Sequence, residues 1–376
     1  LEERLSEKRG ARTGFFAFAD TVAARSFSRV DDTHGWMGIK FQPAPRAEPS
    51  QIVIHVRLLD RESVAQQEAL GVLGVNFVHA ALLGDGGPGA VMASLLDNLS
   101  TERVEVDMIE FTGPAYGGVD NRLMSLGLVQ AGLTHAAMIA ADGRVVQPSA
   151  ALYKKPILVV RGAFRPPTKT ILDLQERALA QFVQEPGVGG EEVVVLMEMT
   201  LRNLMQEGEI RHEDFLARAD MLGALGKTVL ISNYGLYYRL AEYLFGFTKK
   251  PIGLGMGVPT LKELFNEKYY RELPGGILAS FGRLFVNDLR VYVYPQRDAK
   301  TGAVIDADNL LVAPHLRHLY AYLRENRFIE PIRGVAADDL GLDARGVLGL
   351  IRTGDPAWEG MVPEAVAKVI RDRRLW

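Results

Sequence analysis

Three polar residues follow apolar, strand-like runs, and their side chains could do chemistry. Arg161 follows PILVV, Glu198 follows VVVLM and Asn233 follows VLIS. The carboxyl ends of parallel strands share one edge of a sheet, so we expect these side chains to converge there as catalytic residues. Arg161 could hold a phosphate or carboxylate by a two-point contact, Glu198 could be a general base or metal ligand, and Asn233 could orient a substrate. The alternative is that Arg161 and Glu198 neutralise each other as a structural ion pair.

A glycine-rich segment ends another apolar run. Gly253, Gly255 and Gly257 alternate in PIGLGMGV, just before a helix expected to begin near Pro259. Glycines let a phosphate approach closely, and the N–H groups at a helix start favour anions, so the segment predicts a cofactor or phosphate site. The pattern is neither the dinucleotide fingerprint G-x-G-x-x-G nor a P-loop, because no Lys-Ser/Thr pair follows. The alternative is a tight turn whose small residues allow close packing.

The histidines give weaker signals. His34 lies in DDTHGWMG, which is typical of a polar turn with a capping histidine, although a metal or acid/base role is conceivable there. His55 and His79 lie within apolar segments and are expected to be core histidines. His315 and His318 share one helix face, but the H-E-x-x-H pattern is absent. We therefore expect no metal site.

Composition excludes several classes of protein. With 376 residues, 48% of them hydrophobic, the chain can bury a large core. The net charge of −3 comes with no obvious basic stripe, which argues against a nucleic-acid partner. The chain has no cysteine, so disulfides, thiolate metal sites and cysteine nucleophiles are excluded.

No segment predicts membrane insertion or export. The longest weakly polar stretch, Ala69–Gly84, is shorter than the roughly 18 residues of a spanning helix and contains Asn76 and His79, so we expect a buried helix and no membrane partner. The first residues, LEERLSEKRG, contain no apolar signal region, which favours a cytoplasmic location. They also lack an initiating Met, as in a fragment or a processed end.

Strand-like and helix-like segments alternate along most of the chain, which predicts an α/β fold with a mostly parallel sheet. The expected strands begin at eight positions, namely Gln51, Arg103, His135, Pro156, Glu191, Lys227, Pro251 and Leu289. Eight such units fit a (β/α)8 barrel, which is slightly favoured over an open doubly wound sheet. The Asp142-Gly143 pair predicts a β-hairpin, an antiparallel excursion from the parallel sheet.

Three segments are expected from this pattern. Residues 1–50 form an N-terminal extension with a short helix near Phe15–Ser26, a turn at Asp31–Gly38 and a proline-rich connection. Residues 51–300 form the α/β core domain. Residues 301–376 form a C-terminal helical segment that ends in a strong helix at Val362–Arg373.

The end of the chain, VPEAVAKVIRDRRLW, resembles the tail of bacterial nicotinate-nucleotide adenylyltransferases, which tends to read V-P-x-x-V-x-x-Y-I-x-x-x-x-L-Y. Val369 and Trp376 stand where that tail has tyrosines. The family's H-x-G-H and I-S-x-T-x-x-R motifs would serve adenylyl transfer, and neither is present here. The resemblance covers about 4% of the chain and carries no catalytic residue over.

A second resemblance spans most of the chain. Segments such as HGWMGIKFQ, VDNRLMSL, LYKKPILVVRG and EEVVVLMEMTLRNL are similar to a family of bacterial cytoplasmic proteins of uncharacterised chemistry. Its members are often labelled as the same adenylyltransferase, or as TonB-dependent receptors. The resemblance implies a shared fold. The receptor label does not fit a chain without the alternating strands of an outer-membrane barrel.

Two functions follow as hypotheses. The first is a transferase-like protein that binds a phosphorylated small molecule, such as a nucleotide, between Gly253–Gly257 and the residues Arg161, Glu198 and Asn233. The second is a non-catalytic, self-assembling scaffold subunit, because the chain has no intact catalytic signature. In that case the aromatic segment Tyr234–Phe247 and Trp376 would supply contacts in a homo-oligomer. The sequence does not identify a cofactor.

Overall fold

A computed structural model describes residues 7, 14–21, 33–84, 86–298, 300–335, 340 and 344–376. Contacts within the chain divide it into two compact units. Unit 1 comprises Leu1–Ile139 and Arg144–Pro148, and unit 2 comprises Ala140–Gly143 and Ser149–Trp376. The two units are described in turn.

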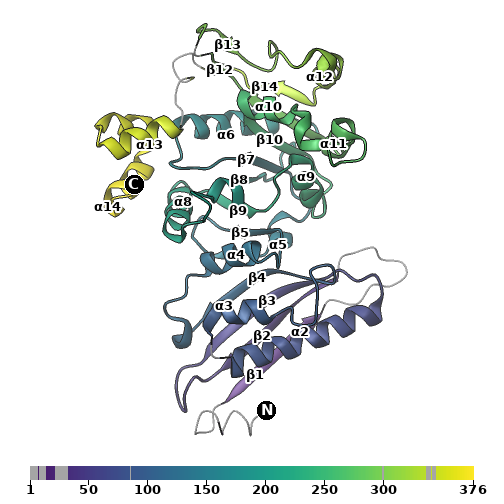
Figure 1. Cartoon of the computed structure of the whole chain (residues 1–376), viewed down its shortest axis with the longest axis vertical. Coiled ribbons are helices and arrows are strands. Elements are labelled where there is room, and N and C mark those ends of the chain that lie inside the picture. Colours follow the sequence, from purple (N-terminus) through teal and green to yellow (C-terminus); the bar gives the residue numbers. More distant parts are fainter. Residues whose placement is uncertain are drawn as a thin grey trace. The chain divides into compact units, whose positions relative to one another are not determined.

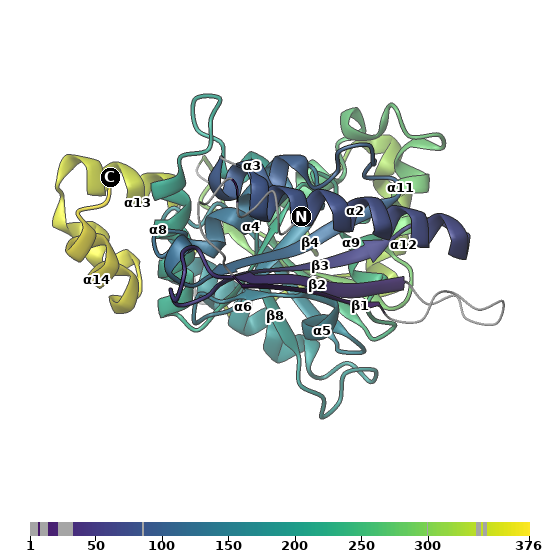
Figure 2. The same ribbon diagram turned by 90° about the horizontal axis from the view of Figure 1, so that it is seen from below.

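Unit 1 is built on an antiparallel sheet in the order β1-β2-β3-β4. The strands are β1 (Phe15–Thr21), β2 (Thr33–Phe41), β3 (Ser50–Leu58) and β4 (Val104–Thr112). Alternate residues of β3, such as Ile52, Ile54 and Val56, are buried in one core with α2 (Ser63–Leu83). Figure 2 shows α2 and α3 (Gly87–Ser94) along one face of this sheet. The alternating pattern therefore places apolar side chains under the helices.

The rest of unit 1 follows β4. A short η1 helix (Pro114–Tyr116) leads to α4 (Asn121–Gln130), and the Asp120 side chain caps α4 by accepting from the Arg122 backbone N–H. β5 (Ala136–Ile139) and β6 (Val145–Val146) then form an antiparallel hairpin. Gly143 has φ +84°, a conformation that glycine adopts easily. The Asp142-Gly143 prediction is confirmed.

Unit 2 contains six parallel strands in the order β14-β11-β10-β7-β8-β9 (Figure 1). They are β7 (Ile157–Arg161), β8 (Val194–Thr200), β9 (Thr228–Ser232), β10 (Ile252–Gly257), β11 (Leu289–Tyr294) and β14 (Ile329–Pro331). The chain adds β8 and β9 on one side of β7 and then returns to place β10 on the other side. The strand order therefore reverses between β7 and β10.

Helices precede, connect and follow these strands, as Figure 1 shows. They are α5 (Pro148–Leu152), α6 (Lys169–Phe182), α7 (Leu201–Leu204), α8 (His212–Ala224), α9 (Tyr237–Phe245), α10 (Val258–Leu264), η2 (Glu267–Tyr270), α11 (Gly276–Leu284), η3 (Pro314–Leu316), α12 (Arg317–Glu325), α13 (Ala344–Thr353), η5 (Pro356–Met361) and α14 (Glu364–Arg373). A small β-ribbon pairs β12 (Gln296–Arg297) with β13 (Val304–Ile305). α6 packs on β10, and α13 and α14 share a core cluster with α8.

The chain is α/β, and its larger sheet is mostly parallel, as the sequence predicts. All eight expected strands exist, but β3 and β4 lie in the antiparallel sheet instead of the parallel one. The C-terminal segment includes the strand β14 as well as helices. The expected boundary at residue 50 falls at the start of β3, between strands that pair with each other.

Two expectations for the first segment are wrong. Phe15–Thr21 is a strand where a helix was expected, and Thr33–Phe41 is a strand that replaces most of the expected turn at Asp31–Gly38. Both segments pair along their length, with Ala17 opposite Ile39. Partners distant in sequence decide such pairing, which local patterns do not reveal. Residues 22–26, 31 and 32 of these predictions lie outside the described residues.

Candidate functional site

The structure brings the three expected catalytic residues to neighbouring strand ends in unit 2. Arg161 ends β7 and pairs in register with Glu198 on β8. Asn233 directly follows β9, which neighbours β8. Gly255 on β10 pairs with Val160, so the carboxyl ends of β7 and β10 also lie side by side. The parallel strands therefore position these residues along one edge of the sheet.

Arg161 and Glu198 form a two-point ion pair. The Arg161 Nε atom donates to Glu198 Oε2 at 2.8 Å, and Nη2 donates to Oε1 at 2.9 Å. The Ser232 hydroxyl also donates to Glu198 Oε1, at 2.6 Å. Glu198 is 0% exposed, so both carboxylate oxygens are engaged inside the protein. This is the geometry of the structural pair that the sequence allows as an alternative to ligand binding.

Arg161 also fixes the loop that carries Asn233. Its guanidinium donates to the carbonyl oxygens of Tyr234 at 2.8 Å and Gly235 at 3.2 Å, and it lies 4.2 Å from the ring centre of Tyr237. Burial opposes the charge of Arg161, but Glu198 and the other neighbours outweigh it, and the pKa of Arg161 is raised. Asn233 is exposed. The largely buried Arg161 thus fixes the loop residues that directly follow the exposed Asn233.

The three glycines of β10 differ in their surroundings. A Cβ atom at Gly253 would lie 2.8 Å from Leu158 Cδ1, and one at Gly255 would lie 2.9 Å from Leu174 Cδ2. These two positions let α6 and β7 pack closely, which is the alternative that the sequence allows. At Gly257 the nearest atom to such a Cβ would be 3.5 Å away. Of these three positions, only Gly257 would accept a Cβ atom without a close contact.

The loop after β7 is held by a second carboxylate. Asp214 of α8 accepts from Arg165 Nε at 2.7 Å and from Trp376 Nε1 at 2.8 Å, and it pairs with the buried Arg218. Arg218 also donates to the Ala163 carbonyl at 3.0 Å. Burial lowers the pKa of Arg218, and Asp214 acts against this effect. Trp376 therefore packs within its own chain.

The aromatic segment of the second hypothesis also packs internally. Tyr238, Phe245 and Phe247 are buried. Tyr243 lies between Tyr234 and Phe247, with ring centres 5.2 Å and 5.0 Å apart. These rings stabilise the packing of α9 in unit 2.

Unit 1 contains a polar cluster that the sequence does not reveal. His34 lies on β2, where it contacts His55, so it is not the cap of a turn. His55 is buried, as expected, but it is hydrogen-bonded to the buried Asp107. The signal lies in RVEVDMIEF, where the buried positions shift phase after Asp107. That shift marks a β-bulge, which can re-aim a side chain.

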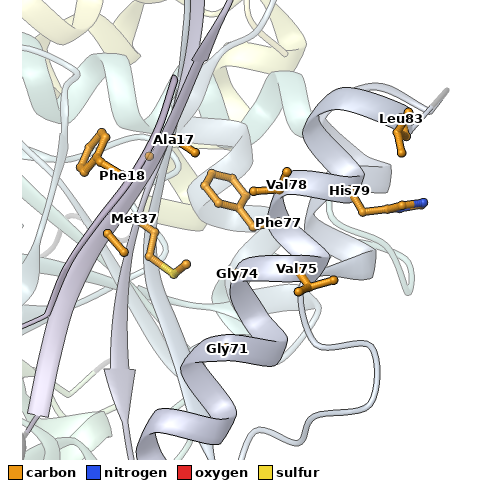
Figure 3. A pocket seen from close by; sticks show the side chains of 12 residues that line it. Ala17, Phe18, Met37, Gly71, Gly74, Val75, Phe77, Val78, His79 and Leu83 are labelled. Carbon is orange, nitrogen blue, oxygen red and sulfur yellow. The ribbon is translucent and has the colours of Figure 1, made fainter. Parts of the chain in front are cut away.

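Unit 1 also contains an apolar pocket of about 580 Å³ between β1, β2 and α2. Figure 3 shows Phe77 on the helix and Met37 on the strand pointing into the space between them. Gly71 and Gly74 form part of its wall on the helix. His79, expected in the core, is exposed at this pocket.

Similarity to known proteins does not identify a function for this geometry. No family model matches the chain, and no curated protein matches it. Among the described residues, no helix combines the length and apolar character needed to cross a membrane. In the same residues, no group of three or more His, Asp or Glu side chains could hold a metal ion.

The Arg161–Glu198 pair makes a stability prediction. Replacing Glu198 by Gln keeps the side-chain volume but leaves Arg161 as a buried, uncompensated charge. We expect the free energy of unfolding, measured in urea, to fall by about 3–5 kcal/mol. The control is Glu207→Gln, which breaks an exposed pair with Arg211 and should cost under about 1 kcal/mol. Similar losses in the two variants would contradict a buried, essential pair.

The environment of Tyr237 predicts that the stability of the protein depends on pH in the alkaline range. Burial raises its pKa to about 12, with Arg161 acting to lower it and Glu198 to raise it. The unfolded phenol ionises near pH 10, so the stability from the buried neutral phenol is complete below pH 10 and is lost as pH rises through about 12. Between pH 10 and 12 the free energy of unfolding of the wild type should therefore fall by about 2 kcal/mol more than that of Tyr237→Phe, which has no phenol to ionise.

The measurement is urea unfolding at several pH values from 9 to 12. Tyr153→Phe is the control, because Tyr153 is 61% exposed. If Tyr237→Phe and wild-type chains lose stability along the same pH curve, the assigned burial of the Tyr237 phenol is wrong.

Proposed function

We propose that unit 2 binds a phosphorylated small molecule at the carboxyl ends of β7 and β10. The observation that carries this proposal is the reversal of strand order between these two strands. Successive strands of a (β/α)8 barrel follow one another around a ring without reversing. We therefore interpret the six parallel strands as an open doubly wound sheet. In such sheets, ligands bind where the order reverses, outside the carboxyl ends of the strands.

The groups near this position favour the binding of an anion. Gly257 ends β10, and unlike Gly253 and Gly255 it is not in close contact with a neighbouring side chain, so its backbone could be approached by a ligand. α6 starts soon after β7, and its first residue, Lys169, is exposed. A helix start and a lysine both favour phosphate. The buried carboxylates beside this edge, Glu198 and Asp214, are neutralised by arginines and do not repel an anion.

The ion pair has a positioning role in this proposal. Glu198 is engaged by Arg161 and Ser232, so it holds the loop after β9 instead of transferring protons. Asn233 then presents its amide from that loop. The resemblance of the chain's tail to nicotinate-nucleotide adenylyltransferases makes a nucleotide the first ligand to test. A transferase would also need a second substrate to accept the transferred group, and this proposal extends only to binding of the first.

Calorimetric titration with ATP and with inorganic pyrophosphate tests this proposal. We expect wild-type protein to bind ATP, and Gly257→Leu to weaken binding at least tenfold, about 1.4 kcal/mol, because the new side chain enters the ligand's space. Gly282→Leu on α11 is the control, because a Cβ there meets nothing within 4 Å. Binding that Gly257→Leu leaves unchanged, or no binding of either probe by the wild type, would overturn the proposal.

A second candidate, a self-assembling subunit, is supported by the edge strand β1. Its hydrogen-bonded neighbour in the sheet is β2, and it carries exposed aromatic side chains, with Phe15 at 40%, Phe16 at 64% and Phe18 at 38% exposure. The apolar pocket beside α2 adjoins the same strand. Exposed apolar edge strands pair readily with another chain. β1, instead of the aromatic segment of α9, would then supply the contact between copies.

Light scattering on the purified chain tests this candidate. A self-assembling subunit should have at least twice the 41.4 kDa mass of one chain. Phe16→Lys should then shift the mass to one chain, since charges on an edge strand oppose pairing. Tyr153→Lys, which replaces an exposed aromatic residue of unit 2, should leave the mass unchanged. A wild-type protein that is strictly monomeric removes the candidate.

A further inference from the structure

The apolar pocket of unit 1 exists because small side chains line the part of the sheet that borders it. On β1, Ala17 and Ala19 pair with Ile39 and Met37 of β2. Residues opposite each other in an antiparallel pair point to the same face, and Ile39 and Met37 belong to the core with α2. The two alanines therefore face the helix side, where both are exposed. The pocket of about 580 Å³ that remains is within the range of small-ligand sites.

Two glycines of α2 form the opposite wall, and packing explains only one of them. A Cβ atom at Gly74 would lie 3.2 Å from Met37 Cε, so contact with this side chain favours glycine there. A Cβ atom at Gly71 would meet no atom of the described residues within 4 Å. Glycine is among the least favourable residues in a helix interior. Gly71 therefore weakens α2 without relieving a close contact within the described chain, and what it preserves is open space in the pocket.

The lining of the pocket offers almost no polar groups. Among the described residues that line it, His79 has the one polar side chain, and Figure 3 shows this side chain pointing away from the strands. The backbone groups of α2 bond within the helix, and those of β1 and β2 lie in the plane of the sheet. A peptide segment in the pocket would leave its own N–H and C=O groups without partners, which is costly. A hydrocarbon chain has no such groups, so the lining favours a hydrocarbon.

The shape of the pocket also limits its occupant. Its wall on α2 runs from Gly71 to Leu83, about 18 Å at 1.5 Å per residue. Even when open solvent at its mouth is included, its volume of about 1100 Å³ gives a mean cross-section of only about 60 Å² over this length. An α-helix with its side chains is about 10–12 Å across, which requires about 80–110 Å². The pocket is therefore too narrow for a helix of a partner protein, but it is long enough for an extended hydrocarbon chain.

We propose that this pocket binds the hydrocarbon chain of a single-chain amphiphile, such as a fatty acid. The chain lies between α2 and β1, against Phe77 and Met37, which point into this space in Figure 3. The polar end of the ligand stays in solvent at the open side, because the described lining residues include no charged side chain to receive it. Affinity grows with chain length as methylene groups leave water. This site consists of residues of unit 1 and does not depend on the phosphate site proposed for unit 2.

Calorimetric titration with sodium dodecanoate and sodium hexanoate, both below their micelle concentrations, tests this site. We expect the wild-type protein to bind one dodecanoate per chain. Hexanoate should bind at least tenfold more weakly, because the shorter chain buries fewer methylene groups. No binding of dodecanoate, many weak sites per chain, or equal affinity for the two acids would overturn the proposal. This comparison needs only the wild-type protein.

The variant Gly71→Leu locates the bound chain. The new side chain enters the pocket, so we expect the affinity for dodecanoate to fall at least tenfold. Leucine is favoured over glycine in a helix, so the Tm of this variant should equal or exceed that of the wild type.

Gly349→Leu is the matched control and should bind dodecanoate as the wild type does. Gly349 is also an exposed glycine inside a helix, α13, and a Cβ atom there would meet no described atom within 4 Å. Wild-type affinity in Gly71→Leu would place the ligand elsewhere, and a marked loss of Tm would show that no open space adjoins this residue. Either result overturns the site.

Discussion

The buried ion pair between Arg161 and Glu198 is the constraint on which the carboxyl edge of unit 2 depends. A buried pair is retained only when good geometry and further hydrogen bonds offset the loss of hydration. Here Ser232 and two carbonyl oxygens supply those bonds. The same contacts join β7, β8 and the loop after β9. Any ligand at this edge therefore meets a surface whose polar groups are already fixed.

Local patterns in the sequence predict most elements of this fold. Apolar runs locate eight strands within a few residues, and the helix expected over Ala69–Gly84 lies within α2 (Ser63–Leu83) apart from its last residue. What local patterns do not contain is the choice of partner strand. β1 and β2 were missed because Phe, Ala and Gly residues suit several local structures. The pairing of β1 with β2 and of β2 with β3 decides their state. The antiparallel placement of β3 and β4 was missed for the same reason.

The candidate site was predictable in position but not in contacts. Parallel strands bring Arg161, Glu198 and Asn233 to one edge, and that follows from the strand pattern alone. The pairing of Arg161 with Glu198 is one of two alternatives that the sequence allows, and the in-register placement of β7 and β8 decides between them. The glycines of β10 look alike in sequence, yet Gly253 and Gly255 accommodate neighbouring side chains while Gly257 does not. The contact of His55 with Asp107 depends on a bulge of one residue.

Four carboxylates are buried among the described residues, and their partners differ between the two units. In unit 2, Glu185, Glu198 and Asp214 each pair with arginine, whose charge is fixed at every physiological pH. Such pairs can hold loops and strands but cannot exchange protons. In unit 1, the buried Asp107 faces His55 instead of an arginine, with Oδ1 2.6 Å from Nδ1. The two units therefore differ in the side chain that each places against a buried carboxylate, an arginine in unit 2 and a histidine in unit 1.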